Sequence, residues 1–96
     1  MKIPKSIKVG GHTYQIEYVN DLVRDDNQLG VMCWQLGKLR LEARQSGNFI
    51  ASTFLHEILH AIDRHYNSRR LSEEDTDRLS EGLFQVLSDM GITFER

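Results

Sequence analysis

The residues best able to do chemistry lie near the middle of the chain, in the run His56-Glu57-Ile58-Leu59-His60. In a helix, two histidines four positions apart lie one turn above each other on the same face. Two imidazole nitrogens placed in this way can bind one zinc ion at roughly 2.0–2.1 Å each. Glu57 lies beside the pair, where a carboxylate can hold a water molecule and take its proton. The motif therefore predicts a metal site with a general base next to it.

The residues around the motif predict a helix over about 48–67. No proline or glycine interrupts this stretch. Its apolar residues recur at spacings of three and four: Ile50, Phe54, Leu55, Ile58, Leu59, Ile62 and Tyr66. Ser46 or Asn48 could cap its start. The pattern HExxH also occurs by chance on amphipathic helices, so a metal-free small protein with an accidental motif is an alternative interpretation.

A second helix is predicted over about 72–90. Ser72 is a suitable N-cap, and Glu73, Glu74 and Asp75 place negative charge in the first turn, where the helix dipole favours it. These three acids are also what capping alone would select. The predicted apolar stripe consists of Thr76, Leu79, Leu83, Val86, Leu87 and Met90. Gly91 is placed to end the helix, and the short tail after it could pack back on the domain.

The first half of the chain predicts strands. Alternating or apolar runs occur within about 5–43, at 7–9, 13–19, 30–35 and 39–42. Gly10-Gly11 between the first two runs is a strong hairpin signal. The polar stretch 20–28 is either a loop or a short helix, and the loop is the preferred interpretation. Two strand pairs followed by two helices predict a single α+β domain over 1–96, with a small antiparallel or mixed sheet of about four strands packed on two main helices.

A catalytic zinc ion usually takes three protein ligands, so a third ligand must join the two histidines. The candidates are Asp63, Glu73, Glu74, Asp77, Glu81, His12 and His65. His65 lies about 180° around the helix from His56, so it faces away from a metal held there. Asp63 lies one turn beyond His60 and is expected to be a partner for a ligand or for Arg64 or Arg69. His12, in or beside the hairpin turn, is expected to face solvent.

Glu73 is the first choice for the third ligand. It lies closest to the edge of the apolar stripe of the second helix, where a side chain can reach a site between two packed helices. Asp77 lies one turn along the same face, and Glu74 and Glu81 lie further round.

Together, His56-Glu57-x-x-His60 and a later helix bearing Glu73-x-x-Thr76-Asp77 resemble the gluzincin pattern. The run 56–63, and 71–74 leading into 77–80, are similar to the small phage-borne members of the ImmA/IrrE metallopeptidase group. The resemblance is strongest over 49–90. It implies a minimal zincin-like domain in which His56, His60 and Glu73 bind zinc, Glu57 is the catalytic base and Asp77 supports a ligating histidine. It also implies limited cleavage of a regulatory protein such as a repressor.

Composition and charge bear on which classes of partner and which cellular location are expected. The net charge of −2, with 27% charged and 40% hydrophobic residues, gives no general attraction to nucleic acid or to an anionic membrane. No apolar run approaches the ~20 residues of a membrane span, and no apolar stretch of a signal peptide follows Met1. Cys33 is the single cysteine, which excludes an internal disulfide and fits a reducing cytosol. We therefore expect a cytoplasmic location.

The leading interpretation is a zinc-dependent metallopeptidase that acts on a protein or peptide substrate, without direct contact to nucleic acid or membrane. An extended peptide could add to a strand edge within 30–42. Tyr66, Tyr14 or Trp34 could help to line the site or stabilise an oxyanion. Manganese, iron or cobalt can occupy similar sites. The alternative is a catalytically silent zincin-like module that regulates a partner protein by contact.

Overall fold

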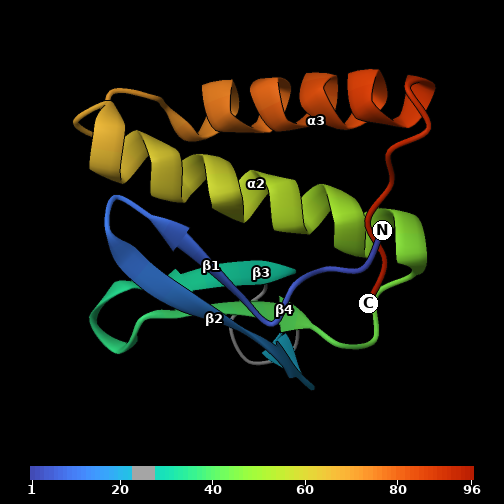
Figure 1. The fold of residues 1–96 in the computed structure, drawn as a ribbon, viewed down its shortest axis with the longest axis horizontal. Coiled ribbons are helices and arrows are strands. Elements are labelled where there is room, and N and C mark those ends of the chain that lie inside the picture. The colour runs from blue at the N-terminus through green and yellow to red at the C-terminus, as the bar shows by residue number, and fades with distance from the viewer. Residues whose placement is uncertain (23–27) are drawn as a thin grey trace.

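The computed structural model describes residues 1–22 and 28–96. The described chain forms three layers, shown in Figure 1. A four-stranded sheet is covered on one face by helix α2 (Gly47–Tyr66), and helix α3 (Glu73–Asp89) lies on the side of α2 away from the sheet. The predicted α+β fold with a mixed sheet and two main helices is confirmed. Most of the loop predicted over 20–28 lies outside the described residues, at 23–27.

The sheet contains β1 (Ser6–Val9), β2 (His12–Val19), β3 (Gly30–Cys33) and β4 (Lys38–Glu42), in the order β1-β2-β4-β3. Both predicted strand pairs form antiparallel ladders. The two pairs join where β2 runs parallel to β4, which makes the sheet mixed. Gly10 and Gly11 have φ values of 61° and 80°, as a tight hairpin turn requires. In the described sheet β1 and β3 are the two edge strands, and Gly30, Val31 and Met32 of β3 line the groove described below.

The second strand pair differs from the prediction at its turn. The predicted strand 30–35 ends at Cys33, and Trp34–Leu36 forms a short 3₁₀ helix, η1. The left-handed conformation of Gly37 (φ 63°) closes this turn, because its N–H donates to the carbonyl of Trp34. Trp34 therefore lies outside the strand, and it lines the groove at the site described below.

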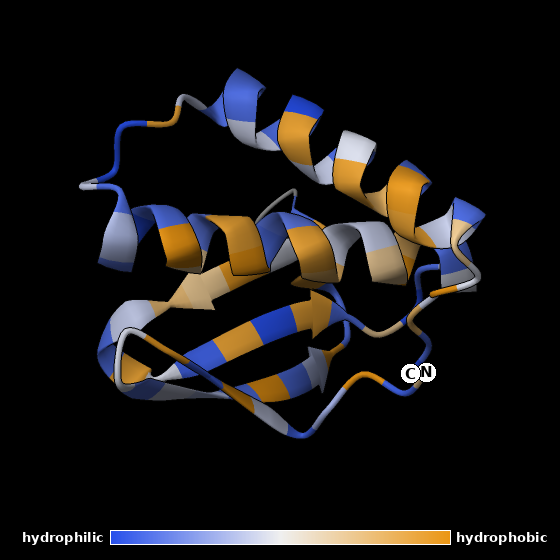
Figure 2. Cartoon of the chain, turned by 45° about the horizontal axis from the view of Figure 1, so that its top comes forward, coloured by the Kyte–Doolittle hydropathy of each residue, from blue (hydrophilic) through white to orange (hydrophobic). Residues whose placement is uncertain are grey.

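The hydrophobic core lies between the sheet and α2. Leu39 and Leu41 of β4 are fully buried and face Ile50 and Phe54 of α2. The C-terminal tail packs back on this core as predicted, with the ring of Phe94 edge-on to that of Phe54 at 5.6 Å. A bridge between Lys2 and Glu95 brings the two termini together, as Figures 1 and 2 show. The core therefore fixes the sheet-facing side of α2 and leaves its opposite side for α3.

The helix boundaries agree with the predictions within one residue. Ser46 is the N-cap of α2, although its side chain makes no capping hydrogen bond. Ser72 caps α3, and its Oγ accepts a hydrogen bond from the N–H of Asp75 at 3.0 Å. Gly91, at φ 79°, follows the last turn of α3. In the described part of the chain, no helix is long and apolar enough to cross a membrane.

The predicted packing face of α3 is wrong in part. Leu79, Leu83, Val86 and Met90 of the apolar stripe are 39–66% exposed, and Figure 2 shows hydrophobic residues recurring along α3. The buried centre is formed by Thr76 and Ser80, at 0% and 2% exposure. Their hydroxyls donate to backbone carbonyls of Ser72 and Asp77, so burial leaves neither unsatisfied. Small side chains with satisfied hydroxyls let α3 lie close to α2 and turn its acidic edge towards the histidines.

Candidate metal centre

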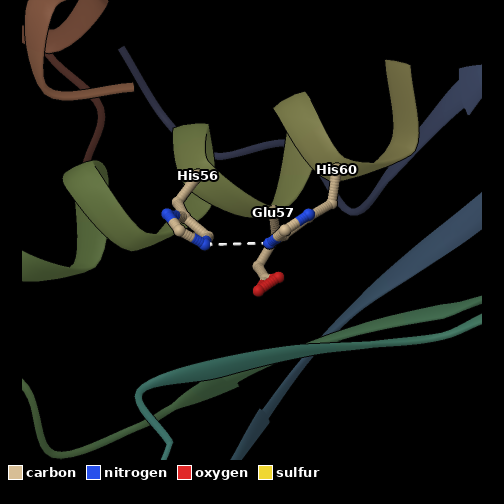
Figure 3. A group of neighbouring side chains, drawn as sticks. All are labelled: His56, Glu57 and His60. Atoms are coloured by element: carbon tan, nitrogen blue, oxygen red, sulfur yellow. Dashed lines mark hydrogen bonds between the residues drawn. The ribbon is translucent and has the colours of Figure 1, made fainter. Parts of the chain in front are cut away.

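His56 and His60 project from one face of α2, as the four-residue spacing requires. Their Nε2 atoms are 2.9 Å apart, and their rings meet edge to face with centroids 4.6 Å apart. Figure 3 shows both rings on the same side of the helix, with a dashed line between the two nitrogens. The side chains are 18% and 27% exposed, so both nitrogens are accessible from a groove without being fully solvated.

Glu73, at the start of α3, contacts both histidines. Its Oε1 lies 2.9 Å from Nε2 of His56, and its Oε2 lies 3.2 Å from Nε2 of His60. Three ligands at 2.0–2.1 Å from a tetrahedral zinc ion would lie roughly 3.3 Å from one another. The three observed separations, 2.9 to 3.2 Å, are close to that value. The donor atoms of His56, His60 and Glu73 could therefore hold one metal ion with little movement.

Asp77 supports this group from behind His56. Its Oδ1 lies 2.9 Å from Nδ1 of His56, the ring nitrogen that faces away from His60. A hydrogen bond from Nδ1–H to a carboxylate fixes the ring orientation and leaves the lone pair of Nε2 available to a metal. Asp77 is one helical turn after Glu73, so a single face of α3 supplies one candidate ligand and one orienting carboxylate.

Glu57 lies beside the histidines but points towards the sheet, as Figure 3 shows. The side chain is buried, with 5% of the residue exposed, and its Oε2 has no hydrogen-bond partner within 1–22 and 28–96. Burial, assisted by the negative charge of Glu73, raises the pKa of the Glu57 carboxyl to about 7. A buried carboxyl with a free oxygen and a pKa near neutrality suits proton transfer better than structural support.

Gly30, the first residue of β3, makes room for Glu57, and the sequence interpretation missed it. A Cβ at this position would lie 2.5 Å from Cγ2 of Thr53 and 3.1 Å from Cγ of Glu57. Only glycine therefore lets β3 approach α2 this closely beside Thr53 and Glu57. The available signal was a glycine opening an apolar strand, which often marks a close backbone approach.

A groove of about 710 Å³ runs over the candidate centre. One wall is formed by Gly30, Val31 and Met32 of the open edge strand β3, and the floor contains His56, Glu57 and His60. Trp34 and Phe49 add aromatic surface, and Phe49 is 62% exposed. The edge strand β3 and the candidate metal group therefore line the same groove.

The other proposed ligands lie elsewhere. His65 faces away from the centre, as predicted, and its Nε2 bonds to the hydroxyl of Tyr14. His12 is exposed, as predicted, but stacks on His65. Glu74 pairs with Arg78 in solvent. Glu81 lines the groove, and in the described structure it forms no hydrogen bond or ion pair with either motif histidine.

Asp63 is buried and its side chain binds the turn after α2, which corrects the expectation that it is a partner for a metal ligand or for Arg64 or Arg69. Its Oδ1 accepts hydrogen bonds from Nδ2 of Asn67 and the N–H of Leu71.

The three aromatic residues considered as oxyanion donors lie in different places. Tyr66 is 70% exposed, and its hydroxyl accepts a hydrogen bond from the N–H of Gly10. Tyr14 is buried, and its hydroxyl bonds to His65. Trp34 is the one of the three aromatic candidates that lines the groove.

Comparisons of the chain with protein-family models, with curated proteins and with solved structures find no match. The function of the chain must therefore be inferred from the site itself.

Proposed function

We propose that this chain is a zinc-dependent metallopeptidase that hydrolyses a peptide bond in a protein or peptide substrate. The main support is the convergence of His56, His60 and Glu73 within 3.2 Å of one another, beside the buried carboxyl of Glu57. Two histidines and one carboxylate form the ligand set of hydrolytic zinc sites that keep a coordination position open. A structural zinc site would ordinarily have four protein ligands.

When bound, zinc would supply a Lewis acid that activates water and polarises a peptide carbonyl. Glu57 takes the proton of the attacking water and then donates it to the leaving amine. Burial is the larger cause that raises the pKa of Glu57 above its ordinary value, and a raised pKa favours the return of the proton to the leaving amine. Asp77 holds the ring of His56 in place through its 2.9 Å contact with Nδ1.

The substrate would bind as an extended strand along β3. Its main chain would pair with the open edge of β3, and its side chains would meet Phe49 and Trp34. The resemblance to the ImmA/IrrE group adds limited cleavage of a regulatory protein, such as a repressor, as the proposed cellular activity.

The test is hydrolysis of a quenched fluorogenic peptide library by zinc-loaded wild type, Glu57→Gln and Glu74→Gln. We expect turnover by wild type and Glu74→Gln, because Glu74 is exposed and paired with Arg78. The Glu57→Gln variant should lose about 10²–10⁴-fold in rate while it keeps its zinc. Equal turnover by all three proteins would assign the activity to a contaminant. Zinc binding with no turnover of any peptide would favour the contact-dependent binding module.

A further inference from the structure

A second hollow, of about 400 Å³, continues the groove beyond His60. It is lined by Trp34, His60, Asp63, Arg64, Arg69 and Leu71. Trp34 and His60 belong to the walls of both spaces, so the two hollows adjoin at these residues. A peptide that crosses the metal centre could therefore place a neighbouring group in the second hollow.

This second hollow carries two guanidinium groups. That of Arg64 lies over the ring of Trp34, 4.5 Å from its centroid, and Arg69 is exposed at the end of the turn after α2. Neither side chain forms an ion pair with a carboxylate in the described ranges. Asp63 is the acid in the lining, and its Oδ1 is already bonded to Asn67 and Leu71. The space thus has an excess of positive charge.

The backbone at Arg69 is unusual for a residue with a side chain. Ser68 and Arg69 have φ values of 54° and 58°, in the left-handed region that favours glycine or asparagine. The conformation is held in part by the N–H of Arg69, which donates to the carbonyl of Asp63 at 3.0 Å. An arginine at a strained position beside a site suggests that its side chain has a use there.

We propose that this hollow is a subsite for a carboxylate of the substrate. The carboxylate would belong either to an aspartate or glutamate close to the scissile bond or to the substrate's own C-terminus. Guanidinium groups bind carboxylates through paired, charge-assisted hydrogen bonds. Arg64 is held at the wall by the Trp34 ring and can turn from that ring to the ligand. This inference deepens the proposed peptidase function and rests on it for the identity of the ligand.

The first test uses peptide substrates that differ in one charge. Glutamate is exchanged for glutamine at each position near the cleaved bond, and a free C-terminal acid is compared with its amide. We expect kcat/KM to be about tenfold higher for the carboxylate form at one position. The preference should weaken as salt is raised, because both cations are accessible to solvent. The position that responds distinguishes a side chain from a C-terminus.

Two matched variants assign the preference to the second hollow. Arg69→Asn removes the charge and keeps a residue that tolerates a positive φ. Arg70→Asn removes the same charge from the next residue, which is exposed and does not line the hollow. We expect the tenfold preference to disappear in Arg69→Asn and to persist in Arg70→Asn. An equal loss in both variants would mean that general charge, and not a subsite, sets the preference.

A binding measurement separates this inference from the proposed function. Trp34 is the single tryptophan of the chain and lines both the groove and the second hollow, so its fluorescence reports binding in either space, and the comparison with Arg69→Asn assigns the change to the second hollow. Amidated alanine pentapeptides with a central glutamate or glutamine, and the free acid of pentaalanine, are titrated into Glu57→Gln protein. A carboxylate-dependent change that is absent in Arg69→Asn would support the subsite even if no peptide is ever cleaved. Peptide cleavage without any charge preference or fluorescence change would overturn the subsite and leave the peptidase intact.

Discussion

The molecule contains two pairs of neighbouring histidines, and they do different things. His56 and His60 turn their Nε2 atoms towards each other at 2.9 Å and meet two carboxylates of α3. His12 and His65 stack their faces, with centroids 5.1 Å apart, and His65 bonds to a tyrosine hydroxyl. Ring proximity is similar in both pairs. Converging nitrogens with a carboxylate partner distinguish a candidate metal centre from an aromatic contact.

Helical geometry explains the difference. His60 and His65 lie on the same helix, but five residues turn them to different sides. His60 faces α3 and the groove. His65 faces the β1–β2 hairpin, where a Cβ on Gly10 would lie only 2.5 Å from its ring. The second pair therefore joins the hairpin to α2, whereas the first pair faces the carboxylates of α3 and could bind an ion.

The largest expected effect comes from removing one histidine of each pair. His60→Ala should abolish the stabilisation that zinc provides, which is about 4 kcal/mol when free zinc is 1,000 times Kd. His12→Ala should leave that stabilisation intact. The measurement is thermal unfolding with zinc and with a chelator. A zinc-dependent shift in Tm that survives in His60→Ala would contradict the assignment of the pair.

The next effect concerns the stability of the metal-free protein. The folded pKa of Glu57, about 7, lies above its ordinary 4.5, so its ionisation opposes folding. The associated stability is fully present below pH 4.5 and is lost as the pH rises through 7. Because one pKa unit corresponds to about 1.36 kcal/mol, Glu57→Gln should be roughly 3 kcal/mol more stable than wild type at pH 8 and similar at pH 4.5.

Urea unfolding in the presence of a chelator measures this difference. Each protein is compared at both pH values, so that other titrating groups cancel between wild type and variant. A stability difference that does not change with pH would show that Glu57 is not buried in its charged form.

A smaller effect is expected from the carboxylate behind His56. Asp77→Asn should weaken zinc binding about 10–100-fold, because the amide orients and polarises the ring less well than a carboxylate. Asp75→Asn is the matched control, since Asp75 pairs with Arg78 and contacts neither histidine. Competition with a chromophoric chelator gives both affinities. Equal affinities would remove Asp77 from the site.

The smallest effect belongs to the second histidine pair. His65→Phe should destabilise the fold by about 1–2 kcal/mol, because the buried hydroxyl of Tyr14 loses its partner. Zinc affinity should not change. Adding Tyr14→Phe should restore part of the lost stability, since the buried hydroxyl that lost its partner is then removed as well. Loss of zinc in His65→Phe would mean that the two pairs are not independent.

The fold class, the helix boundaries and the histidine pair could be predicted because each depends on local periodicity. A four-residue spacing on a helix is enough to align His56 and His60. A glycine pair between two alternating runs is enough to specify the β1–β2 hairpin. No local sequence signal predicts that β2 pairs in parallel with β4, because the two strands are separated in the chain. The sequence therefore predicts only that the sheet is antiparallel or mixed.

Glu73 lies beside both histidines, as expected for the first-choice ligand, but the expected reason for this position is only partly correct. The prediction placed Glu73 at the edge of an apolar stripe that was expected to pack on α2. Much of that stripe is exposed, and packing is centred on Thr76 and Ser80. Hydropathy cannot identify such a face, because small polar residues are buried there for close approach and their hydroxyls bond within the helix.

The central claim is that Glu73 completes a zinc site with His56 and His60. The most direct test is zinc content by mass spectrometry on untagged wild type, Glu73→Ala and Glu81→Ala, after purification with zinc supplied. We predict about one zinc per chain in wild type and Glu81→Ala and a large loss in Glu73→Ala. Zinc retained in Glu73→Ala and lost in Glu81→Ala would contradict the ligand set, and no zinc in any of the three would contradict the metal centre itself.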